Sequence, residues 1–336
     1  MTISPAPANA IVAERLHRVY AKKGRWLRSH GEVVAVEEIS FAVPTGTIFG
    51  LLGPNGAGKT TTIKMLSTLL LPTSGTATIG GHDIVRDERQ VRRQLGVVLG
   101  GDRGLYDKLS AWDNLVYFGT LYGMDATSIQ RRANEVLELV KLQDRAAERV
   151  EGFSRGMKQR LHLAKSLIHN PPILILDEPT IGLDPNAAVD LREAIAALVP
   201  EHTVLLTTHY MHEADQLCRE IAIVDHGRIV ARGSPKEVKG LVAGDRRIEI
   251  TINQALDGTA ATIEREIAAL PGIRGTSREL LETGETRFSL LCAEPTLTLD
   301  GALAALRCHG VAVSAVEVAE PSLEDAFLAI TGRSFE

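Results

Sequence analysis

Residues 53–61 have the residue types and the spacing needed to bind a phosphate group. They read Gly-Pro-Asn-Gly-Ala-Gly-Lys-Thr-Thr, so four residues separate Gly53 from Gly58-Lys59-Thr60. Glycines let successive backbone N–H groups point at one anion, and the N-terminus of a following helix adds partial positive charge. The Lys59 ammonium would reach the β- and γ-phosphates of a nucleoside triphosphate, and the Thr60 hydroxyl would hold Mg²⁺. The nucleotide-binding residues predicted here are Gly53, Pro54, Asn55, Gly56, Ala57, Gly58, Lys59, Thr60 and Thr61.

Two adjacent carboxylates and a histidine are the candidate catalytic groups. Asp177 and Glu178 follow four apolar residues, which places both at the carboxyl end of a buried strand beside the phosphate loop. Asp177 would hold Mg²⁺ through water, and Glu178 would polarise the attacking water. His209 ends another short strand, where it would contact the γ-phosphate. The predicted catalytic residues are therefore Lys59, Glu178 and His209, and the predicted metal ligands are Thr60 and Asp177.

The elements expected to position these residues are strands and helices of an α/β fold. The apolar residues 48–52 predict a buried strand before the phosphate loop, and residues 61–71 have helical spacing after it. Residues 11–20 and 33–43 predict the strands of a small antiparallel sheet. An aromatic side chain there could stack on adenine, with Tyr20 as the candidate and Trp26 as the alternative. A second buried strand is expected over residues 91–99.

The rest of the chain predicts a helical insertion and a separate C-terminal domain. Helical spacing dominates residues 102–165, between the two halves of the nucleotide-binding core. After a linker at residues 243–245, segments of residues 246–336 follow the order βαββαβ and then a last helix. That order is typical of a ferredoxin-like α+β domain. We interpret this domain as regulatory or dimer-stabilising, because it has no cluster of catalytic or metal-binding residues.

Composition and charge restrict the class of protein. The 336 residues carry a net charge of −5, which gives no basic stripe for nucleic acid. Three scattered cysteines favour a reducing compartment over a disulfide framework or a zinc site. Residues 1–10 are rich in Pro and Ala, and we expect them to be disordered and not a secretory signal. No run of 18 apolar residues occurs, so any membrane role is expected to involve a partner.

At residues 153–160 the sequence resembles the ATP-binding subunits of ABC transporters. Phe-Ser-Arg-Gly-Met at residues 153–157 is similar to their Leu-Ser-Gly-Gly-Gln signature, and Ser154 and Gly156 would contact a phosphate at a helix start. Residues 53–60 match the Walker A motif, 174–178 Walker B, 182–184 the D-loop, and His209 the H-loop. The resemblance covers residues 11–240. It implies an ABC cassette over residues 11–242, with a RecA-like core, an antiparallel β subdomain and a helical subdomain.

The resemblance also implies a function and partners. Within the family, residues 157–160 and 321–328 are similar to exporter subunits of the daunorubicin-resistance and polysaccharide-export type. The implied protein hydrolyses ATP with Mg²⁺, closes as a head-to-tail homodimer, and drives a separate membrane permease. It would be cytoplasmic and peripheral on the cytoplasmic face of the cell membrane through that permease.

Three departures from the family pattern keep alternatives open. Gly100 occupies the position of the Q-loop Gln, with Asp102 as a possible substitute, and Arg155 and Met157 replace a Gly and the Gln of the signature. One alternative is a soluble ABC ATPase acting on ribosomes or DNA, although such proteins usually have two cassettes or a coiled-coil insertion. The other is a slowly hydrolysing, nucleotide-gated regulatory module, against which Glu178 and His209 argue.

Overall fold

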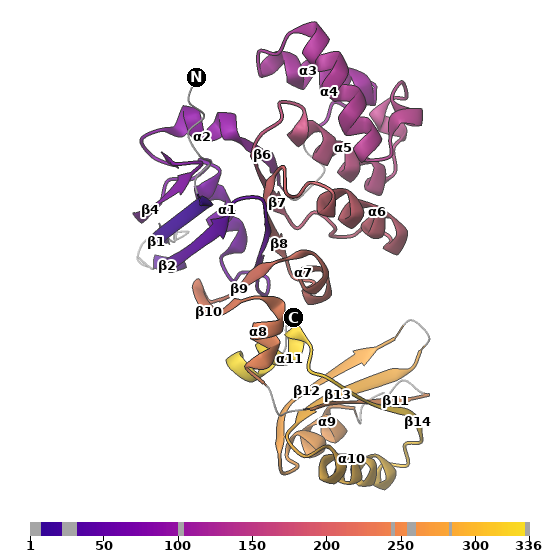
Figure 1. The fold of residues 1–336 in the computed structure, drawn as a ribbon. Coiled ribbons are helices and arrows are strands. Elements are labelled where there is room, and N and C mark those ends of the chain that lie inside the picture. Colours follow the sequence, from indigo (N-terminus) through magenta and orange to yellow (C-terminus); the bar gives the residue numbers. More distant parts are fainter. Residues whose placement is uncertain are drawn as a thin grey trace, which may run out of the picture. The chain divides into compact units, whose positions relative to one another are not determined.

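The computed structural model describes residues 8–21, 32–99, 104–242, 246–253, 260–281 and 284–332. The chain divides into two compact units, residues 1–230 and residues 231–336, which are described separately below (Figure 1).

A six-stranded sheet forms the centre of the first unit. Its strand order is β10-β9-β3-β8-β7-β6, and β9, β3, β8, β7 and β6 pair in parallel. Every residue of β3, β7 and β8 is buried, as expected for parallel strands covered on both faces. The strands are β3 (Ile48–Leu52), β6 (Leu95–Val98), β7 (Ile173–Asp177), β8 (Thr203–Thr208), β9 (Glu220–Asp225) and β10 (Arg228–Gly233).

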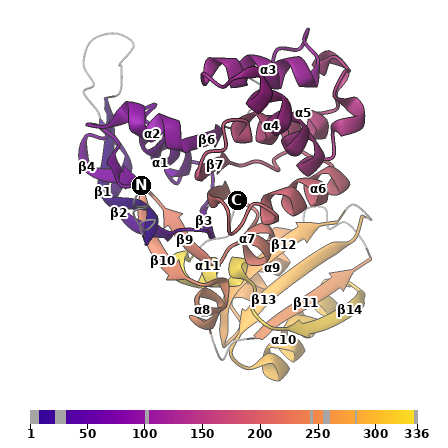
Figure 2. The same cartoon turned by 45° about the horizontal axis from the view of Figure 1, so that its top comes forward.

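An antiparallel sheet packs beside the central one. Its order is β2-β1-β4-β5, and helix α1 (Lys59–Leu66) contacts both β2 and β7 (Figure 2). Ile11, Phe41, Ile63 and Leu205 belong to one hydrophobic core that joins the two sheets. The strands are β1 (Asn9–Ala21), β2 (Glu32–Pro44), β4 (Ser74–Ile79) and β5 (His82–Asp83).

Helices complete the first unit. Side chains of Ser110, Asp125 and Ser154 each accept a hydrogen bond from a backbone N–H in the first turn of the helix that follows, which fixes where three of the helices begin. The helices are α2 (Glu88–Gln94), α3 (Ala111–Leu121), α4 (Ala126–Leu139), α5 (Arg155–Leu167), α6 (Pro185–Ala196) and α7 (Met211–Leu217), with 3₁₀ turns at Gln143–Arg145 and Val150–Gly152.

Three sequence-based element predictions differ from the structure. The strand expected over residues 91–99 is wrong at its start, because residues 91–94 belong to α2 and only Leu95–Val98 pairs with β7. Helix α1 ends at Leu66, not at residue 71, because Thr68 has a left-handed φ of 60°. Strand β1 begins inside the segment expected to be disordered, since Asn9 pairs with Pro44 and Ala10 is buried; residues 1–7 lie outside the described residues.

The second unit is an antiparallel sheet covered by helices. The strand order is β12-β13-β11-β14, and each neighbouring pair is antiparallel. Ile263 of α9 and Leu306 of α10 share a core with Ile250 and Phe288 of the sheet. The elements are α8 (Pro235–Gly240), β11 (Arg246–Ile252), α9 (Ala260–Ala268), β12 (Ile273–Leu280), β13 (Thr286–Cys292), α10 (Pro295–Cys308), β14 (Val313–Ala319) and α11 (Leu323–Thr331).

The division between the units falls after Val230, before the linker used for the sequence-based boundary. Helix α8 follows the β9–β10 hairpin directly in the sequence. It nevertheless belongs to the C-terminal unit, because it packs against α11.

Candidate nucleotide site

The carboxyl ends of β3, β7 and β8 meet at one edge of the central sheet. Strand β8 pairs with β3 on one side and with β7 on the other. The segments that leave these three strands are the phosphate loop, Asp177-Glu178 and His209. Parallel register therefore places the three predicted groups of functional residues side by side.

The phosphate loop depends on glycine at two positions. Gly53 and Gly58 have φ values of 157° and 107°. A Cβ at Gly58 would lie 2.5 Å from the Ala35 carbonyl oxygen, and one at Gly53 would overlap the Val224 carbonyl oxygen. The loop is therefore held tightly on the protein side, while Asn55, Gly56 and Thr60 are exposed. Exposed backbone before a helix N-terminus is the arrangement that binds phosphate.

Lys59 is a buried cation inside this loop. Its side chain is 4% exposed. The Nζ donates hydrogen bonds to the carbonyl oxygens of Gly53 (2.5 Å) and Pro54 (3.1 Å) and lies 3.5 Å from Oε1 of Glu178. Burial lowers the pKa of the Lys59 ammonium, while the carboxylates of Glu178 and Asp177 oppose that shift. The buried ammonium is thus compensated by two carbonyl oxygens and by the nearby Glu178 carboxylate.

Asp177 and two threonine hydroxyls form a second contact. Oγ1 of Thr60 donates to Oδ1 of Asp177 at 3.4 Å, and Oγ1 of Thr207 donates to the same oxygen at 2.5 Å. Asp177 is 4% exposed. Thr207, at the end of β8, also accepts a hydrogen bond from the Glu178 N–H at its Oγ1 (3.0 Å). Sequence reasoning missed Thr207; the signal available was a polar pair ending an apolar strand.

Glu178 lies between Lys59 and His209. Its Oε1 is 3.4 Å from Nδ1 of His209 and 3.5 Å from Nζ of Lys59. The backbone of Glu178 has a left-handed φ of 49°, a conformation that is strained for a residue other than glycine and concentrates at functional sites. The structure therefore brings Lys59, Thr60, Asp177, Glu178 and His209 into one connected cluster.

Comparisons with known proteins identify the family of the chain. Residues 36–181 match the ABC transporter family. The chain is 36% identical over 308 residues to the linearmycin resistance ATP-binding protein LnrL of Bacillus subtilis (strain 168), covering 91% of this chain and 96% of that protein. It is 39% identical over 306 residues to a daunorubicin resistance ATP-binding protein of Streptomyces coeruleorubidus, covering 91% and 93%. The chain belongs to the ABC transporter family.

The fold comparison agrees with the family. A solved structure described as the ATP-binding subunit of an ABC transporter has a TM-score of 0.58 and 28% identity, covering 69% of this chain and 92% of that one. The prediction of an ABC cassette is confirmed. This protein is the ATP-hydrolysing subunit of an ABC exporter, as predicted. Among its described residues, no helix is long and apolar enough to cross a membrane.

The signature residues of this ABC ATPase have contacts of their own, apart from the Lys59 cluster. Ser154 caps α5, with its Oγ accepting from the Met157 N–H at 3.2 Å. Gly156 faces α6 so closely that a Cβ would lie 2.6 Å from the Cβ of Ala187. Ser154 therefore stabilises the N-terminus of α5, and Gly156 allows α5 to pack closely against α6.

Tyr20 lies in β1 and pairs with Val33 of β2. Its ring is 37% exposed, and the Arg18 guanidinium lies 4.9 Å from the ring centre. Trp26 and the Q-loop position Gly100, with Asp102, lie outside the described residues.

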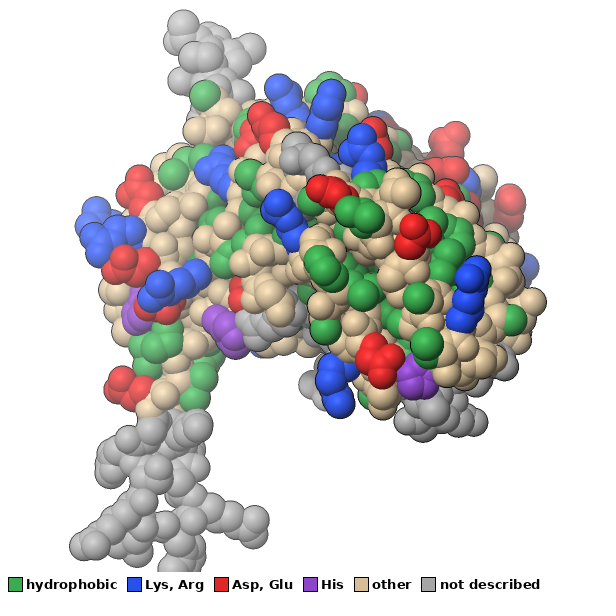
Figure 3. Space-filling view, turned by 90° about the horizontal axis from the view of Figure 1, so that it is seen from below, with side chains coloured by type: hydrophobic (Ala, Val, Ile, Leu, Met, Phe, Trp, Pro, Cys, Tyr) green, Lys and Arg blue, Asp and Glu red, His purple; other side chains and the backbone are tan. Residues whose placement is uncertain are grey.

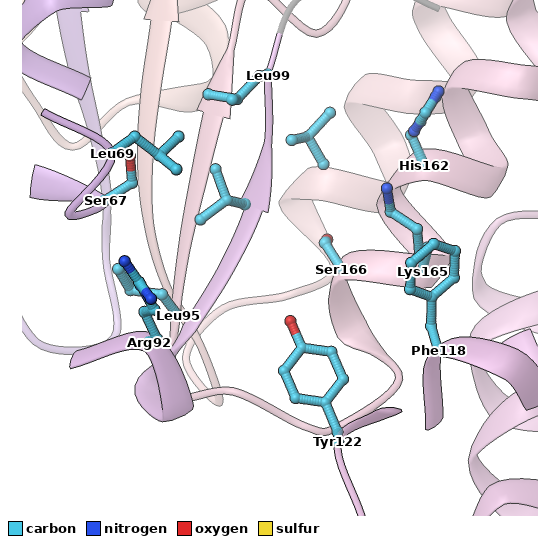
Figure 4. Close-up of a pocket in the computed structure, with 12 residues that line it drawn as sticks. Ser67, Leu69, Arg92, Leu95, Leu99, Phe118, Tyr122, His162, Lys165 and Ser166 are labelled. Carbon is cyan, nitrogen blue, oxygen red and sulfur yellow. The ribbon is translucent and has the colours of Figure 1, made fainter. Parts of the chain in front are cut away.

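A cavity of about 570 Å³ opens beside the last described residue before Gly100. Figure 4 shows Arg92, Leu95 and Leu99 on one wall, and Phe118 and Lys165 on the other. Arg92 belongs to α2, Leu95 begins β6 and Leu99 follows β6, while the second wall belongs to α3 and α5. Burial lowers the pKa of the Lys165 ammonium, whose Nζ donates to the Gly104 carbonyl at 3.1 Å and lies 4.9 Å from the centre of the Phe118 ring.

Proposed function

We propose that the cluster at the carboxyl edge of β3, β7 and β8 hydrolyses ATP with the roles expected from its motifs. The backbone and side chains of residues 53–61 bind the triphosphate, and Lys59 neutralises the β- and γ-phosphates. Glu178 accepts a proton from the attacking water, and His209 contacts the γ-phosphate. The observation that supports this assignment is the position of Oε1 of Glu178, within 3.5 Å of both Lys59 Nζ and His209 Nδ1.

Thr60 and Asp177 are the proposed Mg²⁺ ligands. Their oxygens converge at 3.4 Å, and hydroxyl and carboxylate oxygens with phosphates and water make up the donor set that Mg²⁺ prefers. Among the residues that the structure describes, no group of three His, Cys, Asp or Glu side chains could hold a metal. When bound, the ion would neutralise phosphate charge.

The chain is proposed to act as a homodimer with two composite sites. Ser154 is exposed at the N-cap of α5, and Gly156 lies in the first turn of that helix. The Ser154 hydroxyl and the backbone N–H of Gly156 are the proposed contacts to the nucleotide of a second copy. The helix N-terminus there supplies partial positive charge for a phosphate. ATP would thereby stabilise the closed dimer, because only the closed state makes both sets of contacts. Tyr20 is the proposed partner of the adenine ring.

The cavity of Figure 4 is the proposed contact for the membrane permease. Its walls come from the nucleotide-binding core and from the helices of residues 111–167. A partner bound there would contact both regions, so a movement of one region relative to the other would change its contacts. Exposed Tyr117, Leu121 and Tyr122 of the α3 region add apolar surface nearby. Docking there would place the ATPase on the cytoplasmic face of the membrane.

The exported substrate is proposed to be a drug-type compound to which export gives resistance. The two relatives reported above are named for resistance to linearmycin and daunorubicin. The alternative of an ATPase acting on nucleic acid is not favoured. On the face shown in Figure 3, Lys and Arg side chains alternate with Asp and Glu, and the net charge is −5.

The C-terminal unit is proposed to be a ferredoxin-like domain with a regulatory or dimer-stabilising role. Its element order from β11 to β14 is βαββαβ, and its sheet order is β12-β13-β11-β14. In a split βαβ pattern the first and third strands pair at the centre, which is the position of β11 and β13.

Recovery of the partner tests the exporter assignment. Tagged Glu178→Gln protein is purified with ATP from detergent-solubilised membranes, and Lys59→Ala is the control. We expect a polytopic membrane protein at near one-to-one ratio with the first variant, and turnover lowered by roughly 10²–10⁴-fold. Recovery only in the soluble fraction with ribosomal proteins or nucleic acid would overturn the permease assignment. Unchanged turnover would remove Glu178 as the base.

A further inference from the structure

Arg155 of the signature segment lies against the D-loop of the same chain. Gly182, the first D-loop residue, has a left-handed φ of 66°. A Cβ built there would lie 2.6 Å from Cζ and 2.9 Å from Nη2 of Arg155, and closer still to Nη1. The guanidinium therefore occupies the space that a side chain at Gly182 would need. Arg155 stands where the family signature has a glycine, so this contact is made by the residue in which the chain departs from the pattern.

A second contact joins the same two segments. Gly156 packs against Ala187 at the start of α6, and Asp184 of the D-loop caps α6 by accepting a hydrogen bond from the Ala187 N–H at 3.0 Å. The start of α5 and the segment from Gly182 to Ala187 are thus held together at two points, one of them the exposed guanidinium.

The D-loop leads directly back to the catalytic carboxylate. The Ile181 N–H donates to the Glu178 carbonyl at 3.3 Å, and the Leu183 N–H donates to the Thr180 carbonyl at 3.2 Å. These two hydrogen-bonded turns restrict the backbone between Gly182 and Glu178. The backbone of Glu178 itself has a left-handed conformation. A displacement of Gly182 would therefore also displace the backbone of Glu178.

We propose that the Arg155 guanidinium positions the D-loop, and through it the Glu178 carboxylate, so that the signature segment and the catalytic residue move together. Arg155 is a positioning residue in this account. This role of Arg155 rests on the proposed function in one respect, which is the head-to-tail homodimer. In a head-to-tail homodimer the signature segment faces the nucleotide of the second copy, so this contact would join one nucleotide site to the other.

A double-mutant cycle on turnover tests the contact. Arg155→Ala removes the guanidinium, and Gly182→Ala places a methyl group in its position. We expect each single variant to lower kcat roughly 10–100-fold, the range for displacement of a catalytic group by a distant change. Because both substitutions disturb one contact, the loss of kcat caused by Gly182→Ala should be at least about threefold smaller in the Arg155→Ala background than in the parent. The backbone strain of alanine at Gly182 is present in both backgrounds and cancels in the cycle.

Two further measurements separate positioning from a general structural role. The Kd for ATP of the isolated subunit without Mg²⁺ should stay within about twofold of the parent value, because the phosphate loop is untouched, and Arg155→Lys should recover part of kcat. Arg131→Ala is the control, since Arg131 is an exposed arginine that pairs with Glu135 within α4. That variant should leave kcat unchanged.

Several outcomes would overturn the proposal. They are unchanged kcat in Arg155→Ala, additive losses in the cycle, or complete loss of ATP-driven dimerisation when Arg155→Ala is added to Glu178→Gln. The last result would mean that Arg155 acts on the nucleotide of the second copy. If Glu178→Gln alone fails to dimerise with ATP, the homodimer is disproved, while the turnover cycle still decides the role of Arg155.

Discussion

Thr207 is the residue that links the proposed metal ligand to the proposed base. Its hydroxyl donates to Asp177 and accepts from the Glu178 N–H. Thr207→Val keeps the shape and removes both hydrogen bonds, leaving a buried Asp177 oxygen with one donor fewer. We expect kcat to fall about tenfold, and the Mg²⁺ concentration for half-maximal turnover to rise.

The control for this prediction is Thr207→Ser, which keeps the hydroxyl and should retain most of the turnover. ATPase assays over a Mg²⁺ titration measure both quantities. Equal kcat and equal Mg²⁺ dependence in the valine variant would show that Thr207 only fills space at the end of β8.

Residue types and spacing were enough to predict the cluster but not its internal bonds. Asp177 ends the buried strand β7, and Lys59, Glu178 and His209 come after buried strands, so strand order brings the four residues together. The role of Thr207 depends on register, because Asp177 pairs with Thr207 across β7 and β8. No pattern within either segment specifies that pairing. The Arg155–Gly182 contact could not be predicted for the same reason, because it forms between two segments that are distant in the sequence.

At the scale of elements, the junction of α3, α5 and β6 contains a histidine held neutral. The His169 ring stacks on Tyr122 at 3.7 Å between ring centres, and its Nε2 lies 3.2 Å from the Leu95 carbonyl oxygen. Burial lowers the pKa of His169 to about 4, with a further lowering by the Arg132 charge. Its Nδ1 is buried and makes no hydrogen bond to any described residue, so a proton there would have no acceptor.

This histidine predicts a pH dependence of stability. The pKa is lower in the folded state than the ordinary value of 6.5, so the unfolded state binds more protons between pH 4 and 6.5. The free energy of unfolding is therefore highest above pH 6.5 and falls as the pH drops toward 4. The loss is at most about 2–3 kcal/mol, because the ring is not fully desolvated.

His169→Phe should keep the stacking on Tyr122 and remove this pH-dependent contribution. Thermal unfolding measured from pH 5 to 7.5 should show a smaller drop in Tm toward acid for the variant than for the parent. Loss of the hydrogen bond to the Leu95 carbonyl should lower the Tm by a similar amount at pH 5 and at pH 7.5, so it does not change the slope. Parallel curves for the two proteins would contradict a neutral His169.

Element boundaries were predicted less well than element types, for physical reasons. Residues 88–94 are polar apart from buried Val91, and only pairing with β7 shows that the strand begins at Leu95. Helix α1 stops where Thr68 turns left-handed, which composition does not signal. Helix α8 was grouped with the cassette by chain continuity, whereas its contact with α11 is a property of the folded C-terminal unit.

At the scale of the whole molecule, ATP should control the association of two copies. In the proposed homodimer, ATP hydrolysis would open the dimer, so Glu178→Gln should accumulate the closed form when ATP and Mg²⁺ are present. Sedimentation of this variant should shift from the 36.3 kDa monomer to twice that mass on adding ATP. ADP should leave it monomeric, because ADP lacks the γ-phosphate that both copies are proposed to contact.

The matched control is Glu178→Gln combined with Lys59→Ala. Lys59 supplies the buried ammonium of the phosphate loop, and without it the triphosphate loses its main cationic contact, so this protein should remain monomeric with ATP. Dimerisation of both proteins without nucleotide would show that the interface forms independently of ATP. In that case ATP would act on a dimer that is already formed, and the composite-site proposal would fail.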